Sequence, residues 1–85
     1  MPLRRARGLA WQSVAGEGVV LDLERGRSMG LNSTAILVFS LLDTHDEEQI
    51  AAEVARRFEV ELPQARADVR VFVEFLRRRG LAVDA

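Results

Sequence analysis

The sequence predicts one α+β domain, in which a three-stranded antiparallel sheet is followed by a three-helix bundle. Residues 19–24 alternate with a period of two, which is typical of a half-buried strand, and glycine-containing turns lie on both sides of them. After residue 31, a segment that is apolar nearly all round is followed by two segments with apolar residues at helical spacing. Because a small sheet cannot bury one face by itself, we expect the helices to cover it.

The strands are expected at residues 9–14, 19–23 and 27–31. Residues 15–18 contain two glycines, which can take the positive φ of a tight turn, and residues 24–26 form a second turn. In the middle strand, alternation places Val19, Leu21 and Leu23 on one face and Val20, Asp22 and Glu24 on the other.

The first two helices have recognisable starts. Residues 32–34 offer candidate N-caps for the apolar segment 35–42, and the lack of a polar face in this segment indicates a buried helix. Thr44 and Glu47 fit a capping box, in which each side chain bonds the backbone N–H of the other residue. We therefore expect the second helix to begin just after Thr44.

The third helix is expected from Pro63, a residue favoured in the first helical turn, to about Arg79, with Gly80 as its C-cap. Val71 and Phe75 lie on a flank between its core face and its polar face. Since a buried Phe contributes about 1.5–3 kcal/mol, something should cover this flank. Either a loop or the sheet covers it, or the flank walls a groove beside the third strand. The predicted core stripe consists of Leu62, Ala65, Val69, Phe72, Val73 and Leu76.

The composition argues against several kinds of site. The chain has 85 residues and no cysteine, and His45 is its only histidine, so we expect neither a disulfide nor a metal site. No serine has a histidine placed to activate it, and no glycine-rich loop opens a helix, so we expect no enzyme and no cofactor. The formal net charge of −1 lacks the electrostatic signature of a duplex binder.

The N-terminal residues 1–8, which include Arg4, Arg5 and Arg7, are expected to form a basic, flexible tail ahead of a domain at residues 9–83. This basic start is not followed by the long apolar run of a signal peptide. The sequence also lacks a stretch of about 18 apolar residues that could span a bilayer. We therefore expect a cytoplasmic protein without a membrane partner.

Two ordered sets of residues carry a family resemblance. The first is Leu21-Asp22, a glycine turn, Leu31-Asn32-x-Thr34-Ala35 before an apolar helix, and Leu41-Leu42-Asp43. The second is Thr44-x-x-Glu47-x-x-Ile50-Ala51, followed by Ala67-Asp68-Val69-x-x-Phe72-x-x-x-Leu76-x-x-x-Gly80-Leu81. Together, between Trp11 and Val83, these sets resemble the PqqD-like peptide-recognition domains, which are also called RiPP recognition elements.

The resemblance implies a small winged-helix-like fold and a non-catalytic protein that binds the leader segment of a ribosomally synthesised precursor peptide. In this family the leader adds as an antiparallel strand to the third strand, beside the third helix. The direct step from the strand to the helix at Leu31-Asn32 resembles the stand-alone proteins of lasso-peptide pathways, which implies a leader protease or another modifying enzyme as a second partner. The implied peptide-binding residues are Arg27, Ser28, Met29, Gly30, Leu31, Asp68, Val71, Phe72, Phe75 and Arg78.

Three alternatives stay open. The protein could be a PqqD-type peptide chaperone of pyrroloquinoline quinone biosynthesis. It could be a winged-helix nucleic-acid-binding regulator, because the third helix carries Arg66, Arg70 and the arginines at 77–79, although the acidic net charge argues against a nucleic-acid partner. Finally, the free strand edge could pair with its own copy and form a homodimer.

Overall fold

The structure, a computed structural model, describes residues 3–84 and confirms the predicted α+β fold. It contains the predicted three-stranded antiparallel sheet and three helices, together with a second, two-stranded sheet. The elements in chain order are β1 (Leu3–Arg5), β2 (Leu9–Val14), β3 (Glu17–Asp22), β4 (Arg27–Leu31), α1 (Ser33–Leu41), α2 (Glu47–Phe58), α3 (Leu62–Arg78) and β5 (Ala82–Asp84).

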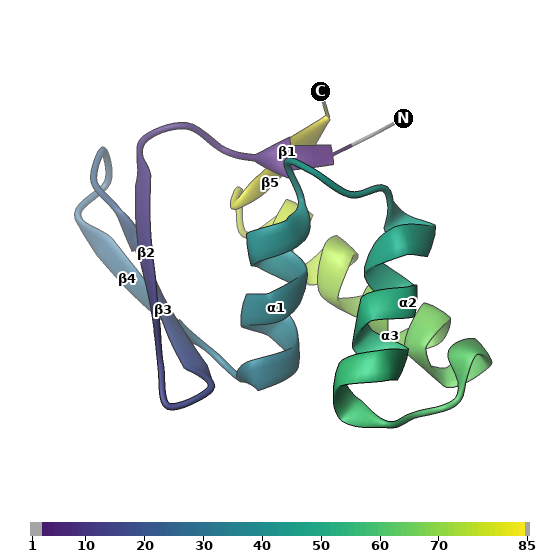
Figure 1. Cartoon of the computed structure of the whole chain (residues 1–85). Helices are drawn as coiled ribbons and strands as arrows, with labels where there is room; N and C mark the ends of the chain where they lie inside the picture. Colours follow the sequence, from purple (N-terminus) through teal and green to yellow (C-terminus); the bar gives the residue numbers. More distant parts are fainter. Residues whose placement is uncertain (1–2, 85) are drawn as a thin grey trace.

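The larger sheet is a meander in the order β2-β3-β4. The β2–β3 turn consists of Ala15 and Gly16, whose φ values of 53° and 81° are both positive, as a type I′ turn requires. This turn is shorter than predicted, because β3 already begins at Glu17. Figure 1 shows α1 between this sheet and the other two helices, so that the core lies on both sides of α1.

The predicted alternation in β3 is present, and the structure identifies the buried face. Val20 is only 1% exposed, whereas Leu23 is 67% exposed and Val19 and Leu21 are also exposed. The more apolar face of this strand therefore points away from the helices. Gly18 explains the close packing of the other face, because a Cβ at this position would overlap the side chain of Ile36 in α1.

The first helix is capped by Asn32, whose side-chain oxygen accepts a hydrogen bond from the Ala35 N–H at 2.9 Å. Val38 and Phe39 in α1 are fully buried, as the apolar sequence predicts. Trp11 of β2 packs edge-on against Phe39, with 5.7 Å between the ring centroids. This contact joins the edge strand β2 to the helical core.

The predicted capping box at the start of α2 is wrong by two residues. Asp46 is the N-cap, and it exchanges reciprocal hydrogen bonds of 2.8 Å with Gln49. Thr44 instead belongs to the turn that closes α1, where its N–H bonds the Leu41 carbonyl and its hydroxyl contacts the His45 ring. The helix therefore begins at Glu47, two residues after the position that a Thr44 cap would give.

The core stripe predicted for α3 is confirmed. Ala65, Val69, Val73 and Leu76 are buried, and Leu62 and Phe72 are half-buried against them. Pro63 lies in the first turn, and Gly80 follows the helix with a φ of 75°. The start and end of α3 therefore lie close to the predicted ones, but the C-cap is Arg79, and Gly80 is the residue after it.

The smaller sheet joins the two ends of the described chain. Leu3–Arg5, part of the expected basic tail, form β1 and pair antiparallel with β5. Arg5 also forms an ion pair of 3.0 Å with Asp43, and the Ala6 N–H bonds the Leu81 carbonyl at 3.0 Å. The remainder of the expected tail at residues 1 and 2 lies outside the described residues.

Candidate functional site

The strand β4 is an edge of the larger sheet, because it pairs with β3 on one side and no other strand of residues 3–84 pairs with it on the other. The bonding pattern of β3 shows which groups of β4 face that open side. The Leu23 N–H donates to the Gly8 carbonyl, so odd-numbered residues in this part of the chain bond toward β2. The even-numbered residues of β3 therefore bond toward β4.

The register then assigns each residue of β4. Met29 lies opposite Val20, and Arg27 and Leu31 likewise lie opposite even-numbered residues of β3, so the backbone groups of these three point into the sheet. The N–H and C=O groups of Ser28 and Gly30 point outward. Within the described chain, no hydrogen bond outside the sheet engages these two residues. They are the two residues of β4 that can pair with an added strand.

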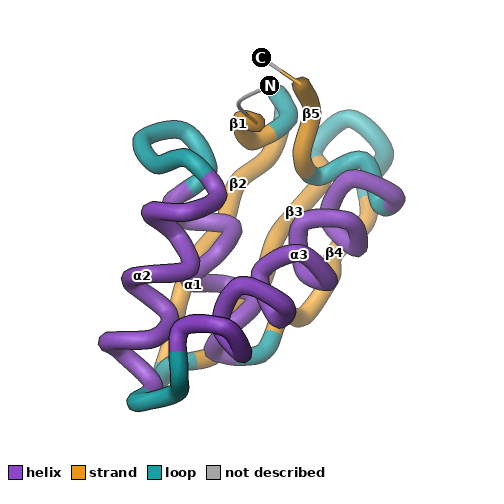
Figure 2. Tube along the Cα trace, turned by 90° about the vertical axis from the view of Figure 1, so that its right-hand side faces the viewer, coloured by secondary structure: helices purple, strands orange, loops and turns teal. Residues whose placement is uncertain are grey.

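A hollow of about 250 Å³ separates the first half of β4 from the C-terminal end of α3. Residues of both elements line it, and in the view of Figure 2 α3 passes in front of β4. The hollow is lined by Val20, Asp22, Arg27, Ser28, Met29, Arg78, Arg79 and Leu81. The lining combines the buried apolar residues Val20 and Leu81, which we call its floor, with exposed arginines from both elements.

The one carboxylate in this lining is already engaged. The Asp22 carboxylate accepts hydrogen bonds from the backbone N–H groups of Glu24 and Arg25, each at 3.1 Å, and lies 3.5 Å from the Arg25 guanidinium. In the part of the chain that the structure describes, Arg27, Arg78 and Arg79 have no carboxylate within ion-pair distance. The hollow is therefore electropositive.

The structure brings together part of the predicted site. Arg27, Ser28, Met29 and Arg78 line this hollow, whereas Gly30 and Leu31 line a different one. The sequence analysis did not identify Arg79, which also lines the hollow and whose guanidinium carbon lies 5.2 Å from the centre of the Phe75 ring. Its place as the last residue of the predicted helix, directly after Arg78, is the signal that could have identified it.

The other predicted residues of α3 lie closer to the N-terminus of the helix than Arg78 and do not line this hollow. Phe72 and Phe75 are half-buried against the core, so the packing covers much of their surface. Val71 is 63% exposed, and no element covers it. Asp68 is half-buried and accepts a hydrogen bond of 2.8 Å from Gln64. The flank of α3 that carries Val71 and Phe75 is therefore covered only in part: Phe75 is partly covered, and Val71 is exposed.

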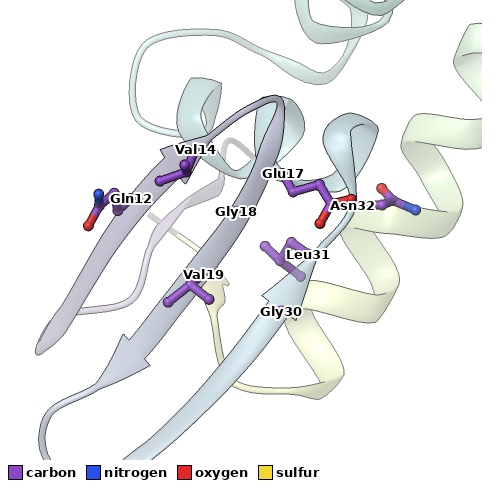
Figure 3. Close-up of a pocket in the computed structure, with 8 residues that line it drawn as sticks. All are labelled: Gln12, Val14, Glu17, Gly18, Val19, Gly30, Leu31 and Asn32. Atoms are coloured by element: carbon purple, nitrogen blue, oxygen red, sulfur yellow. The ribbon is translucent and has the colours of Figure 1, made fainter.

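A second hollow, of about 550 Å³, lies on the outer side of the larger sheet (Figure 3). Val14 and Val19 are exposed on neighbouring strands at this hollow. A Cβ at Gly30 would meet nothing within 4 Å, so this part of β4 is open on its outer side. The sequence analysis did not identify this surface, although the apolar face of residues 19–23 was its visible signal. The lining residues are Gln12, Val14, Glu17, Gly18, Val19, Gly30, Leu31 and Asn32.

The ionisable groups with shifted pKa values lie away from the hollow beside β4. A hydrogen bond of 2.6 Å from Arg56 lowers the pKa of the Glu53 carboxyl, and a hydrogen bond to Glu48 raises the pKa of Arg66. Residues 3–84 contain no group of three or more His, Cys, Asp or Glu side chains that could hold a metal ion. No helix among them is both long and apolar enough to cross a bilayer.

Comparisons with known proteins give one family and two solved structures. The family model described as coenzyme PQQ synthesis protein D (PqqD) matches residues 17–82. A structure described as TbiB1 in complex with the TbiA(beta) leader peptide has a TM-score of 0.84 and 23% identity, over 96% of each chain. A lasso peptide synthetase B1 complexed with the leader peptide has a TM-score of 0.83 and 28% identity, over 99% of this chain and 100% of that one. Curated protein sequences give no match.

Proposed function

The chain belongs to the PqqD family, and from this premise we propose that it binds the leader segment of a ribosomally synthesised precursor peptide without catalysing a reaction itself. The observation that carries the proposal is the unpaired edge of β4, which lies beside the hollow at α3. An extended peptide that adds to this edge would place its side chains in the hollow. The two solved structures with this fold are both leader-peptide complexes, which supports the proposal.

The proposed contacts are the backbone of β4 and one flank of α3. The outward N–H and C=O groups of Ser28 and Gly30 hold the peptide backbone, and the side chains of Arg27, Met29 and Leu31 face the peptide residues on the helix side. The flank of α3 contributes Asp68, Val71, Phe72, Phe75 and Arg78.

Edge pairing alone does not supply enough free energy for binding. Fixing about six peptide residues costs roughly 6–12 kcal/mol of backbone entropy. Ser28 and Gly30 offer about four hydrogen bonds, each worth about 0.5–1.5 kcal/mol. Two or three apolar side chains, each contributing about 1.5–3 kcal/mol when buried, are needed to make binding favourable. The apolar floor of the hollow and the exposed Val71 are the surfaces that could bury them.

We further propose that the bound leader is delivered to a separate processing enzyme, such as a leader protease in lasso-peptide biosynthesis. The likeness to lasso peptide synthetase B1 supports this assignment. The family description favours a second candidate, in which the protein is the peptide chaperone of pyrroloquinoline quinone biosynthesis. Both candidates use the same edge of β4 and differ in the peptide and the enzyme.

The nucleic-acid alternative has less support. In α3, Arg66 forms an ion pair of 2.7 Å with Glu48, and Arg70 one of 2.8 Å with Glu74. Arginines that are already paired with carboxylates contribute little to binding phosphates. The helix that would enter the groove of DNA is therefore largely neutralised on this face.

Amide hydrogen exchange tests the proposal residue by residue. The probe is a peptide selected by mRNA display from a random 12-residue library against the immobilised protein. In the free protein, the Met29 amide should be protected and the Ser28 and Gly30 amides should exchange rapidly. Binding should protect Ser28 and Gly30, while the amides of Trp11 and Ser13, on the other open edge of the sheet, stay unchanged.

Two results would contradict the proposal. One is a library selection that enriches no peptide, and the other is protection at Trp11 and Ser13 in place of Ser28 and Gly30. Sedimentation of the free protein and of the complex tests the homodimer alternative. A free dimer that dissociates when the peptide binds would indicate that β4 pairs with its own copy.

A further inference from the structure

The arginines around the hollow differ from the other arginines of α3. Arg66, Arg70 and Arg77 each have a carboxylate partner, with ion-pair distances of 2.7, 2.8 and 3.3 Å. Arg78 and Arg79 have none among residues 3–84, and both line the hollow. The arginines of α3 that lie away from the hollow are therefore paired with carboxylates. The two arginines at the end of the helix, which line the hollow, are not.

A third arginine lies on the opposite side of the hollow. Arg27 is the first residue of β4, and it is exposed and has no ion-pair partner within the described range. Asp22 lies opposite Arg27 in the strand register, but its carboxylate forms its ion pair, of 3.5 Å, with Arg25 and not with Arg27, and the lining holds three arginines against this one carboxylate. Arg79 is held in place by the Phe75 ring. Together, Arg27, Arg78 and Arg79 form a positively charged cluster, which we call the arginine cluster.

The geometry of an added strand determines which peptide side chains reach this cluster. Side chains alternate between the two faces of a sheet, and Arg27 and Met29 lie on the same face as the buried Val20. The peptide residues opposite Arg27 and Met29 would therefore point to the helix side, where the hollow lies. The peptide residue between them would point to the outer side.

The two positions have different surroundings. The hollow near Met29 has Val20 and Leu81 in its lining, which suits an apolar side chain. The position opposite Arg27 lies at the end of β4 that is close to the C-terminus of α3, since a Cβ at Gly80 would come within 3.3 Å of the Arg25 guanidinium. An arginine fork matches a carboxylate in charge and in shape.

Resting on the proposed function, we propose that the recognised peptide carries an aspartate or glutamate whose carboxylate binds the arginine cluster. In an antiparallel added strand, this acidic residue lies two positions C-terminal to an apolar residue that packs on Met29. The acid opposite Arg27 and the apolar residue opposite Met29 then form a two-point signature. It selects a peptide and also fixes its register on β4.

The test is an mRNA-display selection of random 12-residue peptides against the wild-type protein and two variants. R27E/R78E inverts two charges of the arginine cluster and leaves Arg79 on Phe75. R7E/R57E is the matched control, because Arg7 and Arg57 are also exposed, lie outside the lining of the hollow and have no ion-pair partner in the described chain. Both variants change the net charge by the same amount.

Peptides selected on the wild type and on R7E/R57E should carry Asp or Glu at a fixed position, two residues after an apolar one. Those selected on R27E/R78E should carry Lys or Arg there. In fluorescence anisotropy, wild-type-selected peptides should bind R27E/R78E at least about tenfold more weakly, because the variant replaces charged hydrogen bonds to the acidic residue with repulsion between like charges. Their affinity for R7E/R57E should stay within about twofold of wild type.

The outcomes separate this inference from the proposed function. Selected peptides that protect Ser28 and Gly30 from exchange, but carry no acidic residue at a fixed position, would overturn the inference and leave the proposed function standing. The same acidic consensus on R27E/R78E as on the wild type would also overturn it. A selection that yields no binder, or binders that protect the β2 edge, would overturn both.

Discussion

Proline at Gly30 should prevent peptide binding while leaving the fold intact. The Gly30 N–H points away from β3, so its loss removes no hydrogen bond of the sheet. A Cβ at Gly30 would meet nothing within 4 Å and its φ is not positive, and edge strands accept proline where the N–H faces away from the sheet. The ring would occupy the position from which the amide donates to an added strand. We therefore expect the free energy of unfolding to change by no more than about 1 kcal/mol.

The expected loss of affinity follows from the contacts that proline removes. One hydrogen bond of about 0.5–1.5 kcal/mol disappears, and the ring keeps the peptide backbone from approaching its neighbours. A loss of about 1.4 kcal/mol or more corresponds to at least about tenfold weaker binding. Urea denaturation followed by the fluorescence of Trp11 measures stability, and anisotropy of a labelled display-selected peptide measures binding.

Gly30→Ala is the matched control, because its Cβ enters open space and its N–H remains. Met29→Pro is the opposite control, since Met29 lies opposite Val20 and its N–H points into the sheet. That variant should lose about 1–3 kcal/mol of stability, because it breaks a hydrogen bond of the ladder and leaves its partner unsatisfied. If Gly30→Pro bound peptide within twofold of Gly30→Ala, strand addition to β4 would be refuted.

The remaining predictions test the packing and the caps. Asp46→Ala should lower the free energy of unfolding by about 0.5–2 kcal/mol in urea titrations, while Thr44→Ala should change it by less than about 0.5 kcal/mol, because Asp46 and not Thr44 caps α2. Gly18→Ala should lower it by about 1–3 kcal/mol, since its Cβ would overlap Ile36; an unchanged urea midpoint would contradict this contact. Val71→Ser should leave stability within about 0.5 kcal/mol, because Val71 is exposed, and should weaken peptide binding several-fold in anisotropy if this flank faces the peptide.

The fold could be predicted because local signals and burial agree along most of the chain. The apolar α1, the core stripe of α3 and the Pro63 and Gly80 boundaries each have a local physical cause. The cap of α2 could not be placed, because Thr44 and Asp46 both precede an acidic first turn and each has a suitable partner three residues later. The choice depends on where the turn after α1 ends, which is a tertiary property.

The candidate site was predicted only in outline, for a similar reason. A period of two separates the faces of β3, but it does not say which face the helices cover. The hydrophobicity of Val19, Leu21 and Leu23 favours burial of their face, which is exposed in the structure. The opposite face packs on the helices, because Gly18 allows Ile36 to approach closely. Nor can the sequence show that Ser28 and Gly30, but not Met29, face the open edge. That assignment requires the pairing register between β3 and β4.

This division of roles within β4 bears on how a peptide would be recognised. Backbone pairing at Ser28 and Gly30 has no preference for peptide sequence, because every residue except proline offers the same groups. Selectivity must therefore come from the face of β4 that carries Arg27 and Met29, where the hollow and the arginine cluster lie. Because the cluster lies at one end of β4 and the neutral floor lies nearer its middle, a peptide with one acidic and one apolar side chain fits in only one register. In the proposed complex, the acidic and the apolar side chain together would define both which segment binds and where it begins.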